Sequence, residues 1–161
     1  MYSGRKSIAP FVASPLAVVR MMLKCANLKP GETLYDLGSG DGRVVLMAAK
    51  EFEAYAVGVE LNKRLMEEAV KKSEAIEVGG RARFIHGNIF DVDLSHADVI
   101  TMYLTTGAND KVRPKLEEEL KTGARIVTHD FSIPSWKPSE NLKIREGYRH
   151  HTIYVYIIGV Q

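Results

Sequence analysis

The 161-residue sequence predicts one α/β domain with a doubly wound, seven-stranded mixed sheet. Apolar segments of strand length alternate with segments of helical periodicity through most of the chain, which is the pattern of a parallel sheet covered by helices on both faces. Two strand-like segments near the C-terminus follow each other without a helix between them, which predicts an antiparallel hairpin at one edge. The length suits a single hydrophobic core, and no linker, repeat or low-complexity segment divides the chain.

Residues 1–29 are expected to form an entrance segment and the first helix, and residues 30–161 the cofactor-binding core. The helix is predicted after Ser14 and Pro15, which suit an N-cap and a first helical position. Apolar residues then recur at helical spacing as far as the turn at residues 29–31. The alternation of strands and helices begins after this turn.

The core is expected to contain five parallel strands with helices between them, followed by the hairpin. The first strand is an apolar run before a glycine turn, Asn62 suits the N-cap of a charged helix, and Gly123 suits the stop after the last helix. The expected strands are Thr33–Leu37, Ala54–Leu61, Ala82–Ile89, Asp98–Leu104 and Arg125–Phe131, and the hairpin pairs Leu142–Arg145 with His151–Val160. The expected core helices are Arg43–Phe52, the segment from Asn62 towards Glu77, and Lys111–Leu120.

Composition and charge exclude several classes of protein. Hydrophobic residues make up 45% of the chain and charged residues 26%, as in ordinary soluble domains. A formal net charge of +2 without a long basic run gives no strong nucleic-acid signal. The most apolar stretches are far shorter than the ~20 residues of a membrane-spanning helix. The first residues lack the apolar core of a signal peptide and Cys25 is the only cysteine, so we expect a cytoplasmic protein without an internal disulfide.

The strongest local motif is LYDLGSGDGR at residues 34–43. Gly38, Gly40 and Gly42 lack a Cβ and tolerate positive φ, so they let the chain turn sharply from strand into helix and approach a ligand closely. The spacing is G-x-G-x-G, whereas a dinucleotide-binding turn has its third glycine where Arg43 stands. No Gly-Lys-Ser or Gly-Lys-Thr occurs in the chain, which excludes a P-loop.

Acidic residues around this turn indicate the charge of the ligand. Asp36 and Asp41 would place two negative charges near a pyrophosphate, which is unfavourable, but they suit a ligand with a sulfonium and an α-ammonium group. Glu60 ends the second expected strand about 20 residues later, the expected place for a carboxylate that accepts from both ribose hydroxyls. The turn and its flanking acids together are a strong signal for such a ligand.

These residues resemble the seven-strand S-adenosylmethionine-dependent methyltransferases, which have a Rossmann-like sheet. The resemblance implies S-adenosyl-L-methionine as the cofactor and no metal. In the family, the turn after the first strand holds the methionine part, the acid of the second strand holds the ribose, and the residue ending the third strand meets the adenine amino group. Asn88 stands where many members carry Asp and keeps an acceptor oxygen without the charge. The implied cofactor-binding residues are Asp36, Gly38, Ser39, Gly40, Asp41, Gly42, Glu60, Leu61, Asn88 and Ile89.

The residues at the end of the fourth expected strand limit the chemical classes of methyl acceptor. Amide and adenine N-methylating relatives often have Asn or Asp, two prolines and an aromatic residue there, whereas this chain has YLTT at residues 103–106. Relatives that methylate pyrimidine C5 commonly use a catalytic cysteine. Cys25, however, lies on an amphipathic helix and is expected to be a core residue.

Four segments resemble, in order, the small archaeal protein-lysine methyltransferases, which are related to mitochondrial enzymes that methylate the ATP synthase c-ring protein and the adenine nucleotide translocase. These segments are PFVASP at residues 10–15, KPGETLYDLGSGDGR at 29–43, YL at 103–104 and THDF at 128–131. The resemblance covers nearly the whole chain. The usual first segment is PFVPTP-like: Ser14 keeps a hydroxyl for the cofactor's carboxylate, whereas Ala13 replaces a stiffening proline.

A lysine acceptor must lose a proton before it attacks, because free lysine titrates near ~10.4 and only the neutral amine carries a lone pair. Tyr103 is the first candidate for lining the acceptor channel, although it also suits a wall residue stacked near the cofactor. Asp130, with His129, can orient the amine or receive its proton, although a loop hydrogen bond explains it equally well. His150 and His151 have no partner cluster at metal-ligand spacing and are expected to be a solvated strand start.

The sequence therefore predicts an enzyme that transfers methyl groups from S-adenosyl-L-methionine to lysine ε-amino groups of proteins, with broad specificity. Its expected partners are proteins with exposed lysines, such as chromatin or other basic proteins, and no membrane. Two alternatives stay open. One is a methyltransferase that acts on RNA or a small molecule, and the other is a module that binds S-adenosyl-L-methionine without catalysis.

Overall fold

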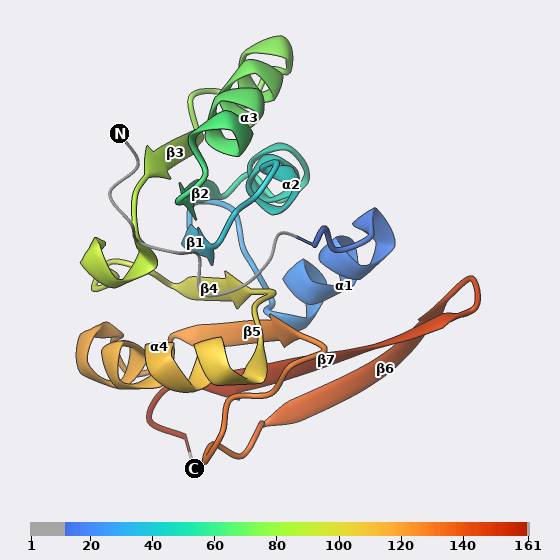
Figure 1. Ribbon diagram of the computed structural model, residues 1–161, viewed down its shortest axis with the longest axis vertical. Coiled ribbons are helices and arrows are strands. Elements are labelled where there is room, and N and C mark those ends of the chain that lie inside the picture. The colour runs from blue at the N-terminus through green and yellow to red at the C-terminus, as the bar shows by residue number, and fades with distance from the viewer. Residues whose placement is uncertain (1–11, 161) are drawn as a thin grey trace.

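Seven strands form one mixed sheet in the computed structural model, which describes residues 12–160 (Figure 1). The strands are β1 Thr33–Leu37, β2 Tyr55–Glu60, β3 Ala82–His86, β4 Val99–Met102, β5 Arg125–His129, β6 Glu140–Glu146 and β7 Arg149–Ile157. They lie in the order β3-β2-β1-β4-β5-β7-β6. The first five run parallel, while β7 pairs antiparallel with β5 and with β6. The predicted parallel sheet and terminal hairpin are confirmed.

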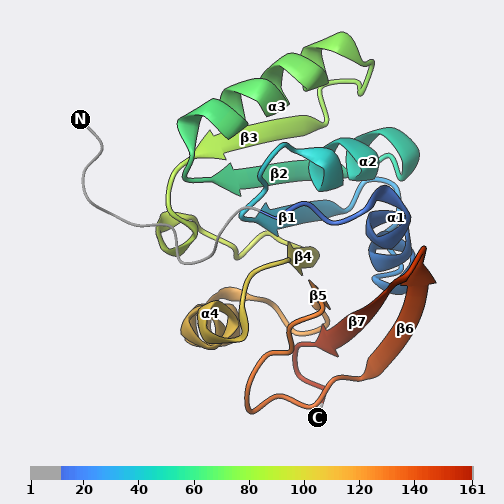
Figure 2. The same ribbon diagram turned by 45° about the vertical axis from the view of Figure 1, so that its right-hand side comes forward.

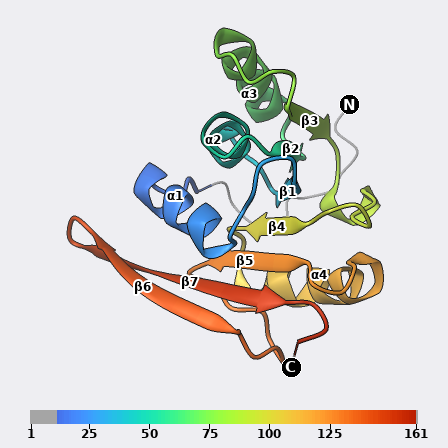
Figure 3. The ribbon, with the colours of Figure 1, turned by 180° about the vertical axis from the view of Figure 1, so that it is seen from behind.

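Helices cover both faces of this sheet. Within the described residues they are α1 Leu16–Cys25, α2 Arg43–Glu51, α3 Lys63–Ala75, α4 Thr106–Glu119 and the short 3-10 helix η1 Ile89–Asp91. α1, α2 and α3 lie on one side and α4 on the other (Figures 2 and 3). Successive side chains along β1 point to opposite faces of the sheet, so β1 contributes to the hydrophobic core on each face. Leu34 packs into the core under α1 and α2, and Leu37 into the core under α4.

Every strand except β1 has an end that differs by one to three residues from the sequence expectations, and two of these differences affect the site. β3 ends at His86, before the expected boundary, because Asn88 accepts a hydrogen bond from a following backbone N–H and starts η1. β7 begins at Arg149 rather than His151, because a two-residue turn at residues 147–148 joins it directly to β6. The hairpin is therefore longer than expected, and His151, which was expected in solvent, lies inside β7.

Two helix starts also differ. α4 begins at Thr106 rather than Lys111, because the Thr105 hydroxyl caps it by accepting from a backbone N–H at 3.1 Å. The glycine and asparagine in this first stretch are poor helix formers, which hides the start in the sequence. α1 follows Pro15, and the expectation that Ser14 caps it is wrong, because the Ser14 hydroxyl bonds to a side chain of β5 instead.

The entrance segment is described only in part. Pro10 and Phe11 lie outside the described residues, whereas Ala13 and Ser14 line a cavity at the end of β1. No helix within residues 12–160 is both long and apolar enough to cross a membrane.

Candidate active site

The strand order reverses between β1 and β4, which is where ligands bind in open α/β sheets. A cavity at this point brings together six residues predicted for the site. They are Ser14, Asp36, Gly38, Ser39, Asp41 and Tyr103. A larger cavity between α4 and the end of β7 contains none of the predicted residues. The candidate site is therefore the smaller cavity at the carboxyl ends of the strands.

The glycine turn after β1 is held against β2. The N–H groups of Gly38 and Ser39 both donate to the Val59 carbonyl, at 2.9 and 3.0 Å. The Ser39 hydroxyl is buried and has no hydrogen-bond partner within the described part of the chain, so a polar group of a ligand would satisfy it. Gly58 makes room for Ser39, because a Cβ at Gly58 would lie 2.6 Å from the Ser39 Oγ. Gly58 was not predicted, and its signal was a lone glycine inside a strand.

Asp36 places a buried carboxylate at the end of β1. Thr101 is its register partner on β4, and the Thr101 hydroxyl donates to Asp36 Oδ1 at 2.8 Å. Burial raises the pKa of Asp36 to about 7; the Thr101 hydrogen bond opposes this, and the carboxylates of Glu60 and Asp41 reinforce it. A cationic group of a ligand would favour the ionised form. Thr101 was not predicted, because only the pairing of the strands reveals it.

Glu60 lies at the end of β2 and connects two turns. Its Oε1 accepts from the Gly40 N–H at 2.7 Å, and its Oε2 accepts from the Asn62 N–H at 2.8 Å. Each oxygen keeps a lone pair for a further donor such as a hydroxyl. Leu61 follows directly, and its carbonyl lies 3.1 Å from Nε2 of His86. The carboxylate thus joins the glycine turn to the edge where a ribose is expected.

The predicted adenine-edge residues follow β3. Asn88 Oδ1 accepts from the Phe90 N–H at 2.9 Å and retains a second lone pair. The Ile89 side chain is buried and packs into the core under α4. Asn88 therefore offers an acceptor to a ligand, while the Ile89 side chain has a packing role.

An ion pair joins the glycine turn to the entrance segment. Asp41 Oδ2 lies 2.7 Å from Nη2 of Arg43 and 3.7 Å from Nζ of Lys72. Burial raises the pKa of Asp41, but the hydrogen bonds and charges of these cations outweigh it and hold the pKa below its usual value. Arg43 Nη1 also donates to the Ser14 carbonyl at 3.0 Å. Arg43 was missed as a site residue. Gly42, between Asp41 and Arg43, is the N-cap of α2 and has φ of 84°. A Cβ at Gly42 would lie 2.7 Å from the Cβ of Ala69 on α3, so the turn packs closely against that helix.

Tyr103 follows β4 and stacks on a side chain of β5. Its ring centroid lies 3.9 Å from that of His129, at an interplanar angle of 26°, and 6.2 Å from that of Phe131. Burial raises the pKa of Tyr103, and the Asp130 carboxylate adds to the effect. Asp130 has φ of 61°, and its Oδ1 accepts from the Thr152 N–H at 2.9 Å. The loop hydrogen bond considered for Asp130 therefore exists, and the second carboxylate oxygen, Oδ2, faces Nε2 of His129 at 3.4 Å and Nδ1 of His151 at 3.7 Å.

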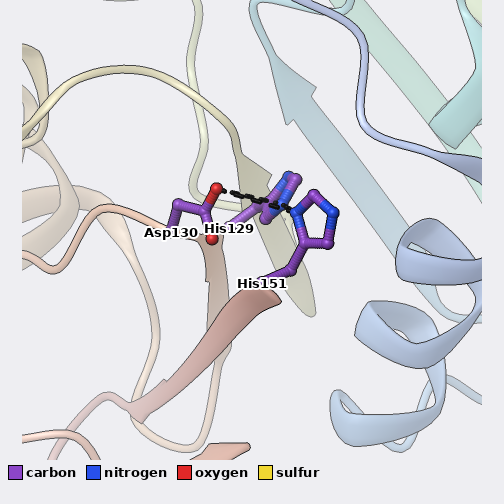
Figure 4. Close-up of side chains that lie close together, drawn as sticks. All are labelled: His129, Asp130 and His151. Atoms are coloured by element: carbon purple, nitrogen blue, oxygen red, sulfur yellow. Dashed lines mark hydrogen bonds and ion pairs between the residues drawn. The ribbon is translucent and has the colours of Figure 1, made fainter. Parts of the chain in front are cut away.

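Two buried histidines lie beside Asp130 (Figure 4). Nδ1 of His129 lies 2.8 Å from the Ser14 Oγ, and Nε2 lies 2.8 Å from Nδ1 of His151. Burial lowers the pKa of His129 to about 4, so the ring is neutral at neutral pH. The expectation of a solvated strand start at His150 and His151 is wrong for His151, which is only 5% exposed. His151 lies on β7 two residues before the buried Ile153, so both side chains point to the same face of the sheet.

Asp36→Asn is expected to stabilise the unliganded protein at neutral and alkaline pH. Folding raises the pKa of Asp36 from 3.8 to about 7, so the folded state binds more protons in this window and stability falls as pH rises through it. The variant lacks this loss and should be more stable than the wild type by on the order of 4 kcal/mol above pH ~7, with little difference near pH ~4. Urea unfolding of both proteins across this range is the measurement. If the free energies of unfolding of the two proteins changed with pH in the same way, the raised pKa of Asp36 in the folded state would be contradicted.

Comparison with known proteins gives matches over nearly the whole chain. The family model described as ANTKMT methyltransferase domain matches residues 36–140. A protein-lysine N-methyltransferase of Saccharolobus islandicus is 47% identical over 151 residues, which cover 93% of this chain and 94% of that protein. The adenine nucleotide translocase lysine N-methyltransferase of Mus musculus is 31% identical over 131 residues, which cover 80% of this chain and 56% of that protein.

A solved structure agrees with these matches. The crystal structure of an RNA methyltransferase from Salinibacter ruber, in complex with S-adenosyl-L-homocysteine, superimposes with a TM-score of 0.85 at 37% identity, covering 91% of this chain and 94% of that one. The resemblance drawn from the glycine turn and Glu60 and the predicted Rossmann-like fold are both confirmed. The chain is a methyltransferase and belongs to the ANTKMT methyltransferase domain family.

Proposed function

We propose that this methyltransferase transfers the methyl group of S-adenosyl-L-methionine to lysine ε-amino groups of proteins. The observation that carries the proposal is the 47% identity to a protein-lysine N-methyltransferase, over 93% of this chain and 94% of that relative. The acceptor side of the site agrees with it chemically. The aromatic ring of Tyr103 and the nearby carboxylate of Asp130 suit an aliphatic stem that ends in a cationic amine.

The residues at the end of β1 and β2 fit S-adenosyl-L-methionine. Asp36 offers a buried negative charge to its α-ammonium group, and the buried Ser39 hydroxyl offers an unused polar contact. Glu60 has lone pairs for the ribose hydroxyls, and Asn88 has one for the adenine amino group. Ser14, at the entrance, contributes a hydroxyl near the cavity. The G-x-G-x-G spacing and the carboxylates of Asp36 and Asp41 distinguish this site from a dinucleotide site.

The chain's main tasks are alignment and removal of one proton. When bound, S-adenosyl-L-methionine would supply an electrophilic methyl group to the lysine nitrogen, and its sulfonium sulfur would keep the electron pair of the broken C–S bond. Asp130 Oδ2 receives the proton that the ε-ammonium group must first lose. Tyr103 lines the path of the lysine stem, and its stacking on the buried His129 fixes the ring. Holding the two reactants in line supplies several kcal/mol, within the ~7–11 kcal/mol that proximity and orientation can provide.

The proposed acceptors are exposed lysines of many proteins, with basic proteins such as chromatin components among them. RNA is the second candidate acceptor, because the Salinibacter ruber structure that shares 37% identity is that of an RNA methyltransferase. The net charge of +2 favours protein over RNA, since RNA-binding surfaces usually carry a strong basic excess.

Incubation with labelled S-adenosyl-L-methionine and a cell extract tests the acceptor class. We expect label on lysine side chains, identified by mass spectrometry of peptides, and loss of the macromolecular label after protease treatment but not after ribonuclease treatment. Glu60→Ala protein, weakened in cofactor binding, is the control for labelling by other enzymes. Label that disappears with ribonuclease, or that stays in small molecules, would overturn the lysine proposal.

Asp130→Asn tests the role of the carboxylate. Asn tolerates the left-handed backbone that Asp130 adopts, so the substitution removes the charge while preserving the loop. Because proton transfer by a positioned group contributes about 100-fold or more, kcat should fall by roughly that factor at neutral pH. The affinity for S-adenosyl-L-homocysteine should stay unchanged. A variant with wild-type kcat would assign Asp130 to the loop hydrogen bond alone.

Glu60→Ala should weaken binding of S-adenosyl-L-homocysteine by roughly 10- to 100-fold, because hydrogen bonds to a charged group contribute about 1.5–3 kcal/mol. Isothermal titration calorimetry gives the affinity. Glu68→Ala on the exposed side of α3, which removes only an ion pair with Arg64, is the matched control and should bind normally. Equal affinities of the Glu60 variant and the wild type would refute the ribose assignment.

A further inference from the structure

Three groups that bind metals converge where β5 and β7 meet (Figure 4). Nε2 of His129 and Nδ1 of His151 lie 2.8 Å apart, and Asp130 Oδ2 lies 3.4 and 3.7 Å from these two nitrogens. The point equidistant from the three atoms is about 1.9 Å from each, so an ion about 0.7 Å above their plane would have bonds of about 2.05 Å. Tetrahedral Zn²⁺ has bonds of about 2.0–2.2 Å and ligand atoms about 3.3–3.6 Å apart, so the two histidine nitrogens, which lie at hydrogen-bond distance without an ion, would separate by about 0.5 Å when the ion binds.

The outer nitrogens of the two rings differ in their surroundings. Nδ1 of His129 lies at hydrogen-bond distance, 2.8 Å, from the Ser14 hydroxyl, whereas Nε2 of His151 has no hydrogen-bond partner among the described residues and lies 3.6 Å from a carboxylate oxygen of Glu146. Without an ion, one of the two inner nitrogens donates to the other. With an ion bound, a proton on each outer nitrogen would leave both inner nitrogens free to act as ligands. Such outer partners orient metal-binding histidines and fix their tautomers.

Burial and strand pairing make this arrangement rigid. His129 is fully buried and His151 is 5% exposed. The side chain of Asp130 is 30% exposed, which gives an ion a path from solvent. Asp130 is tied to β7 because its N–H donates to the Thr152 carbonyl at 2.7 Å and its carboxylate accepts from the Thr152 N–H at 2.9 Å. Two imidazoles and one carboxylate are thus held together before any ion arrives.

We propose that His129, Asp130 and His151 bind a divalent transition-metal cation of the Zn²⁺ type, with water as a fourth ligand. Imidazole donors favour Zn²⁺, Co²⁺ or Ni²⁺ over Mg²⁺ and Ca²⁺, which prefer oxygen ligands throughout. The ion takes no part in methyl transfer. Where the proposed function holds, it occupies the oxygen of Asp130 that receives the lysine proton and inhibits the enzyme.

Titration of the untagged, chelator-treated chain with Zn²⁺ by calorimetry tests the site, and Co²⁺ reports its geometry through the visible absorption of a tetrahedral complex. One ion should bind per chain. His151→Gln should weaken binding by at least about 100-fold, and Ser14→Ala by about 10-fold, because outer partners contribute less than ligands. Asp130→Asn, which suits the local backbone, is a second ligand variant and should also lose affinity.

His150→Gln is the matched control, because His150 is exposed and adjacent to His151 in sequence. It should bind Zn²⁺ as the wild type does. Absence of 1:1 binding, or equal affinity of the His150 and His151 variants, would overturn the metal site. Zn²⁺ that binds at this site without slowing methyl transfer would overturn the inhibition and the role of Asp130 in catalysis, and it would leave the site itself established.

Discussion

Parallel pairing of β1 with both β2 and β4 is the constraint on which the site depends. Its register sets Asp36 opposite Gly58 on one side and Thr101 on the other. Gly58 leaves the space that Ser39 fills, and Thr101 donates to the buried carboxylate. A slip of one residue in either pairing would turn these side chains to the opposite face of the sheet. The hydrophobic cores on the two faces fix this register, and they therefore also fix the positions of the side chains of the site.

The two ends of the site are built in different ways. The proposed cofactor end comes mainly from one continuous turn, closed by Glu60 from the neighbouring strand. The proposed acceptor end is assembled from the ends of β4, β5 and β7, where Tyr103, His129 and His151 come together. Binding of the cofactor at one end does not determine which acceptor binds at the other, since the acceptor depends on the side chains that the outer strands supply.

This difference explains how much the sequence predicted. Strand and helix periodicity, the glycine turn and the cap at Asn62 are local signals, and the structure has the elements they predict. Thr101 and the inward position of His151 depend on which strands become neighbours, which no local pattern states. The early start of β7 was also hidden because its turn, Gly147-Tyr148, lacks the Asn-Gly or Asp-Gly pair typical of two-residue hairpins.

The buried carboxylate of Asp36 has a consequence for the life of the enzyme in a cell. An ionised group with little solvent and no cationic partner among residues 12–160 weakens the empty fold, whereas a bound cation on that group favours the folded state. A ligand that binds only folded chains protects them from unfolding by mass action, and proteases remove chains that unfold. A ligand that places a cation beside Asp36 would therefore make the stability of the folded chain depend on the concentration of that ligand.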